Sequence, residues 1–428
     1  MNLTAIKNGF IDQLKKGNLS FYIILLIMII LPIQNRYLPP LMIVLGIIWI
    51  LEIVVDVLNP LKTPIKYRVL LYFFLIYFFW QLLGILYTSD VKMGWANIFG
   101  RLSLIVFPII IFSPTEKVKT KIYFLLKTFA VSTTIYIIVC ILYAFIRSLS
   151  IINSTWVFNP HPQDYYWLNY FYGMDFTLSI HPSYLAMYVL LSFFIAIEAS
   201  GDQYLKMKHR VLWIINSLFL LISLYFISSR AGILAAFISI PYLGIQKFIK
   251  TNRYRLLWLV FMFLLIPVSI FVINKNLRIQ NIFKAKAEEQ KTEIKIQDDR
   301  LKIWKSAINI ISDNLIVGVG IGDVRDELVK EYNRQDEIRL SENRLNAHNQ
   351  FLEVFIENGL IGFVIFLSLI SFMIYLAISE ANLIYGLFIL MMIVFFMFET
   401  TLYRLAGVSF FSLFSFLLLY YKPQRQKE

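Results

Sequence analysis

Three basic side chains stand beside apolar stretches of this sequence, where the presence of a charged group calls for an explanation. Arg230 lies in SLYFISSRAGILAAF, in a turn of a few residues between two apolar runs, Arg300 opens DRLKIWKSAINIISD, and His348 precedes NQFLEVF. Guanidinium groups bind phosphate oxygens bidentately, and imidazole takes a proton from a hydroxyl near neutral pH. The three residues therefore predict a site where the polar head of a substrate meets an apolar environment.

Other residues are weaker candidates for the same site. Arg101 is a basic residue beside an apolar run, and His181 (SIHPSYLAMY) stands at the start of one. Each residue also has a structural interpretation: an arginine extends to a membrane interface along its alkyl stem, and a histidine ahead of a proline starts a helix. The sequence leaves both interpretations open.

The chain that carries these residues is strongly apolar. Of its 428 residues, 59% are hydrophobic and 17% are aromatic, whereas soluble domains have about 45–50% apolar residues. A helix needs about 20 apolar residues to cross a bilayer. By that measure we predict an all-α polytopic membrane protein with about twelve transmembrane helices, near residues 20–33, 39–57, 68–87, 101–113, 122–148, 182–199, 211–228, 231–246, 255–273, 358–378, 382–399 and 403–421.

The basic residues between these spans alternate in a way that predicts topology. Five breaks rich in Lys and Arg, near residues 62–68, 117–121, 206–210, 247–255 and 422–427, fall on one side together with both termini. This is the positive-inside pattern, so both termini are predicted to be cytoplasmic. The net charge of +13 is explained by these breaks, which argues against nucleic acid as a partner. Arg230 and Arg101 fall on the opposite, external side.

Two external loops are large enough to hold a site. Residues 148–183 form an aromatic loop, and the longer one contains Leu301, Trp304, Ile308 and Ile311 at helical spacing. We predict an amphipathic surface helix there, with these four residues on its apolar face. The predicted organisation is nine transmembrane helices in 1–274, a large external loop in 275–357, and three further helices with a cytoplasmic tail in 358–428.

The sequence lacks the motifs of several common types of functional site. The sequence has no Cys-rich or His-rich metal spacing, no Walker motif and no GxSxG elbow. Gly318, Gly320 and Gly322 (VGVGIGD) suggest a nucleotide fingerprint, but no strand–helix unit surrounds them, so a flexible turn is the better interpretation. Ionisable residues are almost absent within the predicted spans, which argues against an ion-coupled transporter. No metal site and no cofactor are expected.

The segments SSRAGILAAF, DDRLKIWKSAINIISDNLIVGVGIGD and HNQFLEVFIENGLIGF together resemble, in this order, the signature regions of the O-antigen ligase and O-antigen polymerase superfamily. The resemblance covers about residues 228–366. It implies a GT-C-like glycosyltransferase of the bacterial inner membrane that needs neither metal nor nucleotide. Such enzymes transfer a glycan from an undecaprenyl diphosphate carrier to an acceptor hydroxyl on the periplasmic face, in contact with membrane lipids.

Carried over to this chain, the resemblance implies that Arg230, Arg300 and His348 are catalytic. Glu357, Gly359 and Gly362 match a glutamate–glycine element that follows the histidine. We expect Arg101, His181, Trp304 and Glu357 to contribute to substrate binding, with the helix that bears Trp304 covering the site.

Ligase and polymerase differ in their acceptor, which is the lipid A-core oligosaccharide for one and another carrier-linked repeat for the other. The motifs do not separate them, and we favour the ligase. The alternative from a different class is a polysaccharide transporter or flippase. That function requires charges along a central cavity, whereas the charges here lie at the outer ends of the spans.

Overall fold

The computed structural model describes residues 12–14, 16–55, 57–58, 60, 63–152, 154–161, 169–250 and 299–422. These residues are mostly helical, with one two-stranded hairpin, and seven helical segments are long and apolar enough to cross a membrane. The predicted class of all-α multi-pass membrane protein is therefore confirmed. The seven segments are Asn35–Val54, Ile65–Leu86, Val91–Ile111, Ile122–Ser148, Pro182–Ser200, Met207–Ile227 and Gln350–Ser379.

Eleven of the twelve predicted spans fall on described helices. The twelfth, 255–273, lies outside the described residues. Four of the eleven correspond to apolar helices shorter than a full span, so the total of twelve stays a prediction. The helices of the bundle are α2 (Asn18–Ile30), α3 (Leu38–Val54), α4 (Ile65–Leu83), α5 (Val91–Gly100), α6 (Ser103–Ile111), α7 (Glu116–Thr120), α8 (Ile122–Ser148), α9 (Pro182–Ser200), α10 (Met207–Ile227), α11 (Arg230–Lys250), α17 (Gln350–Ser379), α18 (Leu383–Phe398) and α19 (Leu405–Leu417).

Helix α9 lies at the centre of the bundle. It packs against α8, α10, α11 and α18, and almost every residue from Pro182 to Ala196 is buried. A helix that is apolar around its whole circumference needs such a position. Short 3-10 turns, η1 (Asn35–Tyr37), η3 (Gly84–Leu86), η5 (Thr401–Tyr403) and η6 (Leu418–Tyr420), connect or extend the bundle helices.

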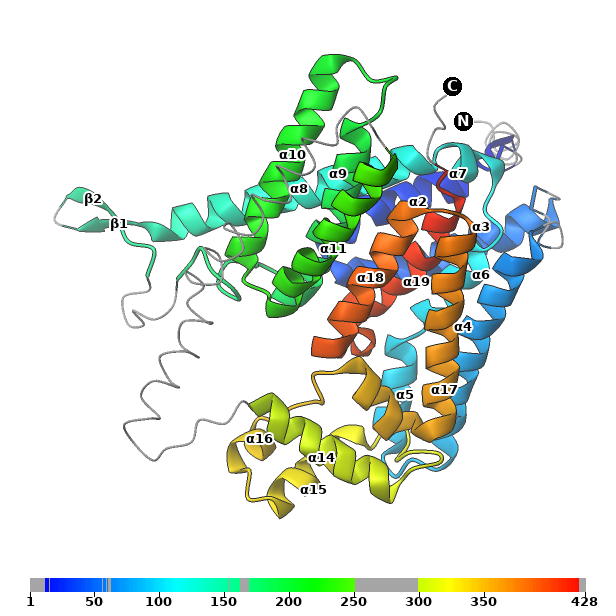
Figure 1. The fold of residues 1–428 in the computed structure, drawn as a ribbon, viewed down its shortest axis with the longest axis vertical. Coiled ribbons are helices and arrows are strands. Elements are labelled where there is room, and N and C mark those ends of the chain that lie inside the picture. Colours follow the sequence, from blue (N-terminus) through cyan, green and yellow to red (C-terminus); the bar gives the residue numbers. More distant parts are fainter. Residues whose placement is uncertain are drawn as a thin grey trace, which may run out of the picture.

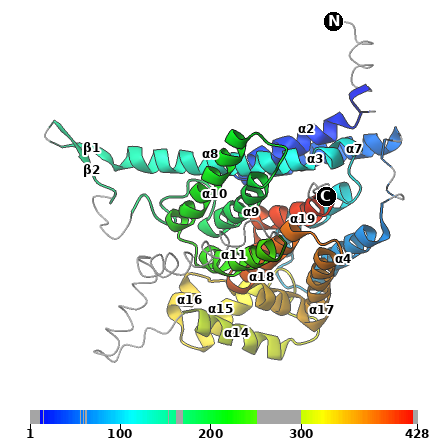
Figure 2. The same ribbon diagram turned by 45° about the horizontal axis from the view of Figure 1, so that its top comes forward.

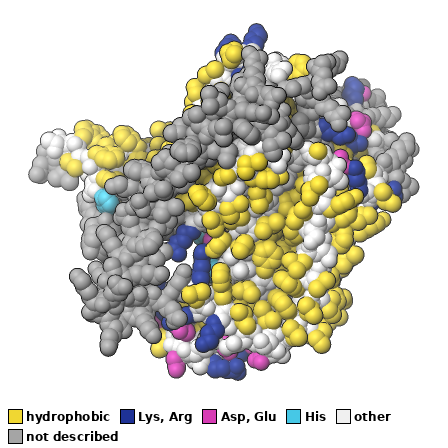
Figure 3. Space-filling model, in the orientation of Figure 1, with side chains coloured by type: hydrophobic (Ala, Val, Ile, Leu, Met, Phe, Trp, Pro, Cys, Tyr) yellow, Lys and Arg dark blue, Asp and Glu magenta, His cyan; other side chains and the backbone are white. Residues whose placement is uncertain are grey.

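The Lys- and Arg-rich segments between spans, which the sequence places on one side, lie at one end of the bundle. Lys66 at the start of α4 forms an ion pair with Glu380 after α17, Lys117 donates a hydrogen bond to Asn18 at the start of α2, and the Lys119 ammonium lies 5.9 Å from the ring of Tyr420. The start of α2 and the end of α19 lie near α7 in Figure 1. In Figure 3 a broad apolar surface separates two groups of charged side chains.

The opposite end carries a separate helical layer (Figures 1 and 2). Helices α14 (Asp299–Asp313), α15 (Val324–Arg334) and α16 (Ile338–Glu342) pack on one another and, through α14 and α15, on α17. They share a second apolar core formed by Ile303, Ala307, Ile310, Val324, Leu328, Tyr332, Leu340 and Ile356.

The apolar face predicted for α14 is partly wrong. Ile311 is buried and Trp304 is partly buried, but Leu301 and Ile308 are 57% and 55% exposed. The buried stripe instead follows Ile303, Ala307 and Ile310. The reason is that α14 turns toward α15 and α17 rather than lying with its most apolar residues against one surface.

An antiparallel hairpin extends α8 beyond the bundle (Figure 1). Strand β1 (Leu149–Ile152) pairs with β2 (Thr155–Phe158), with Leu149 opposite Phe158. Trp156 and Phe158 are exposed. The hairpin belongs to the predicted aromatic loop, whose residues 162–168 lie outside the described part of the chain.

Candidate functional site

The site begins with a break in α17. Gly359 has φ 62° and ψ −166°, which interrupts the helix after two turns. Because the ladder of helical hydrogen bonds is lost there, the freed backbone groups need other partners. Val319 and Gly320 donate to the carbonyls of Ile356 and Glu357 at 2.9 and 3.1 Å, and Leu360 donates to Leu315 at 2.8 Å. The segment that follows α14 thus supplies hydrogen-bond partners for the backbone groups freed at the break in α17.

The glycine run predicted as a flexible turn is instead closely packed. Gly318 and Gly320 have φ of 76° and 95°, a region that favours glycine. A Cβ on Gly318 would lie 2.5 Å from the Ile356 carbonyl, and one on Gly322 would lie 2.2 Å from the Asp90 carbonyl. Small residues are needed because the backbones of two segments touch here. Directly after the glycine run, the Asp323 carboxylate accepts hydrogen bonds from the backbone amides of Ser89 and Asp90 at 2.6 and 2.7 Å.

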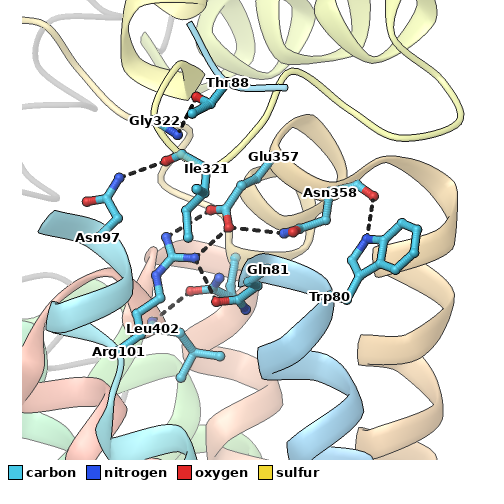
Figure 4. Close-up of polar contacts among 11 residues, drawn as sticks. Trp80, Gln81, Thr88, Asn97, Arg101, Ile321, Gly322, Glu357, Asn358 and Leu402 are labelled. Carbon is cyan, nitrogen blue, oxygen red and sulfur yellow. Dashed lines mark hydrogen bonds and ion pairs between the residues drawn. The ribbon is translucent and has the colours of Figure 1, made fainter. Parts of the chain in front are cut away.

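Arg101 and Glu357 meet in a buried ion pair beneath this break (Figure 4). The guanidinium donates to both carboxylate oxygens at 2.5 and 2.8 Å and to Gln81 at 3.1 Å, while Asn358 donates to Glu357 at 3.1 Å. The side chains of Arg101 and Glu357 are 5% and 2% exposed. Sequence reasoning expected both residues to bind substrate; the structure places their charged groups against each other. The pair ties α5 to the first turns of α17.

His348 lies just before those turns, in the loop between α16 and α17. Its φ of 45° is uncommon for a residue other than glycine, and such strained backbones gather at functional sites. The loop is held at both ends: Asn346 donates to Thr400 at 2.7 Å, and Gln350 accepts from the Leu402 amide at 2.7 Å. The His348 side chain is 34% exposed, so it is fixed by its neighbours and still accessible.

Glu399, the residue after the end of α18, faces His348. The two side chains approach to 3.7 Å between Nδ1 and a carboxylate oxygen, and Ser183 donates to the other oxygen at 2.8 Å. Burial opposes ionisation of Glu399, but the contacts with His348 and Ser183 and the nearby His181 outweigh it and lower the pKa of the carboxyl. Sequence reasoning missed this residue. The available signal was a lone acidic residue at the outer end of an apolar run (VFFMFETT).

Arg300, on α14, also contacts the end of α18. Its guanidinium donates to the Phe398 carbonyl at 3.3 Å and lies 5.5 Å from the Phe398 ring. Phe398 immediately precedes Glu399. The structure therefore brings the predicted Arg300 and His348 to the two sides of the same α18 terminus.

His181 and Arg230 start two helices that adjoin this terminus. The His181 ring nitrogen Nδ1 accepts from the Ser183 amide at 3.3 Å, and thereby caps α9. Helix α11 begins at Arg230, and a Cβ on Gly232 would lie 2.6 Å from the Ala186 side chain. The first turn of α11 therefore packs against the start of α9, one turn from Ser183.

Trp304 behaves differently from these residues. It packs beside the core shared by α14, α15 and α17, and its indole Nε1 is buried with no hydrogen-bond partner among the described residues. No described group of three or more His, Cys, Asp or Glu side chains has the arrangement of a metal site. The chemistry that this terminus offers is a carboxylate–imidazole pair beside the guanidinium of Arg300.

The arrangement defines a multi-pass helical membrane protein with a polar site at one end of its bundle. Residues 215–367 match the family model described as O-antigen ligase, and this match supports the O-antigen ligase superfamily. The resemblance seen in the sequence is thereby confirmed. Members of the family are glycosyltransferase-like enzymes. The matched region contains Arg230, Arg300, His348 and Glu357, whereas Glu399 lies outside it. No curated protein matches this chain.

Proposed function

We propose that the protein is an O-antigen ligase that transfers a glycan from undecaprenyl diphosphate to the lipid A-core oligosaccharide. The observation that carries the proposal is the meeting of Arg300, His348 and Glu399 at the end of α18, within a chain whose residues 215–367 match the ligase family. The site lies at the end of the bundle opposite the basic breaks. By the positive-inside rule that end is periplasmic and both termini are cytoplasmic.

The donor would be held by its diphosphate. Undecaprenyl diphosphate is already a good leaving group, so the protein has to bind it and stabilise the charge that develops as the anomeric bond breaks. Arg300 beside Phe398 and Arg230 at the start of α11 are the guanidinium groups for that role, since both adjoin the terminus that carries Glu399. The prenyl chain would remain in the bilayer between helices.

His348 would activate the acceptor hydroxyl. A carboxylate at Nδ1 favours the tautomer with its proton on Nδ1 and its lone pair on Nε2, and Glu399 stands 3.7 Å from Nδ1. Catalytic hydrogen bonds are often long without substrate and shorten when it binds. The acceptor oxygen attacks the anomeric carbon, its proton passes to Nε2, and the diphosphate departs with the bonding electrons. This single displacement inverts the anomeric configuration and needs no cofactor.

The wider features of the proposal follow from the same arrangement. We propose a GT-C-like enzyme in the bacterial inner membrane, with a periplasmic unit at residues 275–357 between the two sets of transmembrane helices, 1–274 and 358–428. Residues 299–342 provide its described helices α14, α15 and α16. The concentration of basic and acidic groups at one end supports an enzyme with one-sided access over a flippase, which needs charge along its central path.

A reconstitution tests the proposal. Purified protein is incubated with undecaprenyl-diphosphate oligosaccharide and lipid A-core, without metal or nucleotide, beside H348A, R230A and the control H209A, which alters a histidine at the opposite end of the bundle. We expect glycan on the lipid A-core with wild type and H209A and almost none with H348A or R230A.

Two results would contradict the ligase. A ladder of longer carrier-linked glycans would identify a polymerase that uses the same residues. No transfer to either acceptor, with lipid moving between leaflets instead, would exclude the enzyme and favour the flippase.

A further inference from the structure

A partly enclosed cavity adjoins the His348 loop. It lies between α5, the start of α15, the loop before α17 and η5, and its lining includes Arg101, Arg325, Asn346, Glu353 and Tyr403. Its volume is about 60 Å³. A water needs roughly 10–15 Å³ by the same measure, so the cavity holds a few hydroxyl-sized groups. That is room for the edge of one sugar ring and not for a longer glycan.

The buried carboxylate of Glu353 indicates that an occupant of this cavity would donate hydrogen bonds. The residue is 3% exposed, and its carboxylate accepts one hydrogen bond, from the Ala347 amide at 3.3 Å. No described basic group lies within ion-pair distance of it. A carboxylate has about four acceptor sites, and a buried one needs donors. Hydroxyl groups entering the cavity would supply them.

Two further groups suit a sugar. The guanidinium of Arg325 lies 5.3 Å from the centre of the Tyr403 ring, which places an aromatic face and a multiple hydrogen-bond donor at the same wall. Asn346 adds an amide whose nitrogen is held by Thr400. Ligand pockets typically combine aromatic surface with a few fixed polar groups in this way.

The cavity also lies on the acceptor side of the site. Helix α11, which begins with Arg230, packs on α9 and α18, whereas the cavity is enclosed by α5, α15 and α17. Asn346 lines the cavity and is two residues from His348. A sugar held there would present a hydroxyl to the His348 side, on other helices than α11, which begins with Arg230.

We propose that this cavity is the subsite for the acceptor sugar that carries the attacking hydroxyl. The proposal rests on the proposed function and adds where the acceptor binds. Glu353 and Arg325 would bind its hydroxyls, and Tyr403 would contact the face of its ring. These residues act in binding, so they should determine the KM for the acceptor without determining the KM for the donor.

The test compares E353Q, R325A and Y403A with R334A. Arg334 lies on the same helix as Arg325 but at its other end, and its side chain is 73% exposed. Initial rates are measured while acceptor and donor are varied separately. Loss of one buried hydrogen-bonding contact costs about 1–3 kcal/mol, or about 5- to 150-fold. We therefore expect the acceptor KM to rise by about 10-fold in the three cavity variants, with the donor KM and R334A unchanged.

Binding is measured separately from transfer. Delipidated core oligosaccharide is titrated into detergent-solubilised wild type, R325A and R334A by calorimetry, and we expect weaker binding for R325A alone. Unchanged acceptor KM in all three cavity variants, or an equal rise in donor KM, would overturn the subsite. If wild type transfers no glycan, the proposed function fails; equal oligosaccharide binding by R325A and R334A would then overturn the subsite as well, and weaker binding by R325A would still support it.

Discussion

Two contacts between an acid and a base stand at opposite ends of the first two turns of α17. Arg101 and Glu357 form a bidentate pair that is almost fully buried. His348 and Glu399 approach to 3.7 Å and keep 34% and 21% of their side chains exposed. The charged groups of the buried pair are satisfied by each other, whereas the exposed pair can meet a substrate. The difference supports the proposal that the first contact holds the helix segment and that the second belongs to the reactive site.

Replacing His348 should have the largest effect on activity. A general base contributes about 10²–10⁴-fold to the rate, so H348A should lower kcat by that factor. Because the side chain is partly exposed, the thermal unfolding temperature should change little. Rates and unfolding curves measured on the same preparation check both expectations. A large fall in the unfolding temperature would show that His348 is structural, and would remove the contrast with the buried pair.

The buried pair should show the reverse behaviour. Removing one partner leaves an uncompensated buried charge, which costs about 3–5 kcal/mol. R101M and E357Q should therefore unfold at a much lower denaturant concentration. The double variant R101M/E357L removes both charges and should recover much of that loss. A double variant as unstable as R101M would show that the instability comes from losing the pair and its packing, and not from an uncompensated buried charge.

The carboxylate beside His348 should matter less than the histidine itself. A hydrogen bond to a charged group is worth about 1.5–3 kcal/mol, so E399Q should lower kcat by about 10- to 100-fold. In the H348A background the same change should have little further effect, because Glu399 acts through the imidazole. Equal loss in both backgrounds would separate Glu399 from His348.

The glycine pairing that completes the α17 break can be tested by adding a single methyl group. G318A places a Cβ at positive φ and 2.5 Å from the Ile356 carbonyl, at a cost of about 1–3 kcal/mol. G46A is the matched control, because no atom lies within 4 Å of that Cβ and alanine favours a helix. Denaturant unfolding should show G318A destabilised and G46A unchanged or stabilised. Equal stability would contradict the close pairing.

Acidification should have the smallest effect, and its sign follows from Glu399. Because the folded protein lowers the pKa of this carboxyl, the folded state binds fewer protons than the unfolded state. The stabilisation is complete above the ordinary carboxyl pKa and is lost as the pH falls through the lower, folded value. Unfolding of wild type and E399Q across this range should converge toward low pH. A constant difference would show that Glu399 is not stabilised as an anion.

The sequence alone determined the features that depend on neighbours along the chain. Runs of apolar residues fixed the multi-pass helical class, because each span has to satisfy its own backbone in a bilayer. The three ordered segments indicated the family whose model matches residues 215–367, and they pointed to Arg230, Arg300 and His348. Their position beside apolar stretches predicted a common site for Arg300 and His348, and the resemblance implied their catalytic role.

Tertiary structure decided the pairing of residues that are distant in the chain. Arg101 and Glu357 are 256 residues apart, and only the tertiary fold, which brings the end of α5 to the first turns of α17, turns two expected substrate ligands into one buried ion pair. The partner of His348, Glu399, comes from the end of another helix. The glycine run became a rigid contact because a second backbone approaches it. Composition and periodicity describe one segment at a time, whereas these contacts depend on how helices pack and in which register.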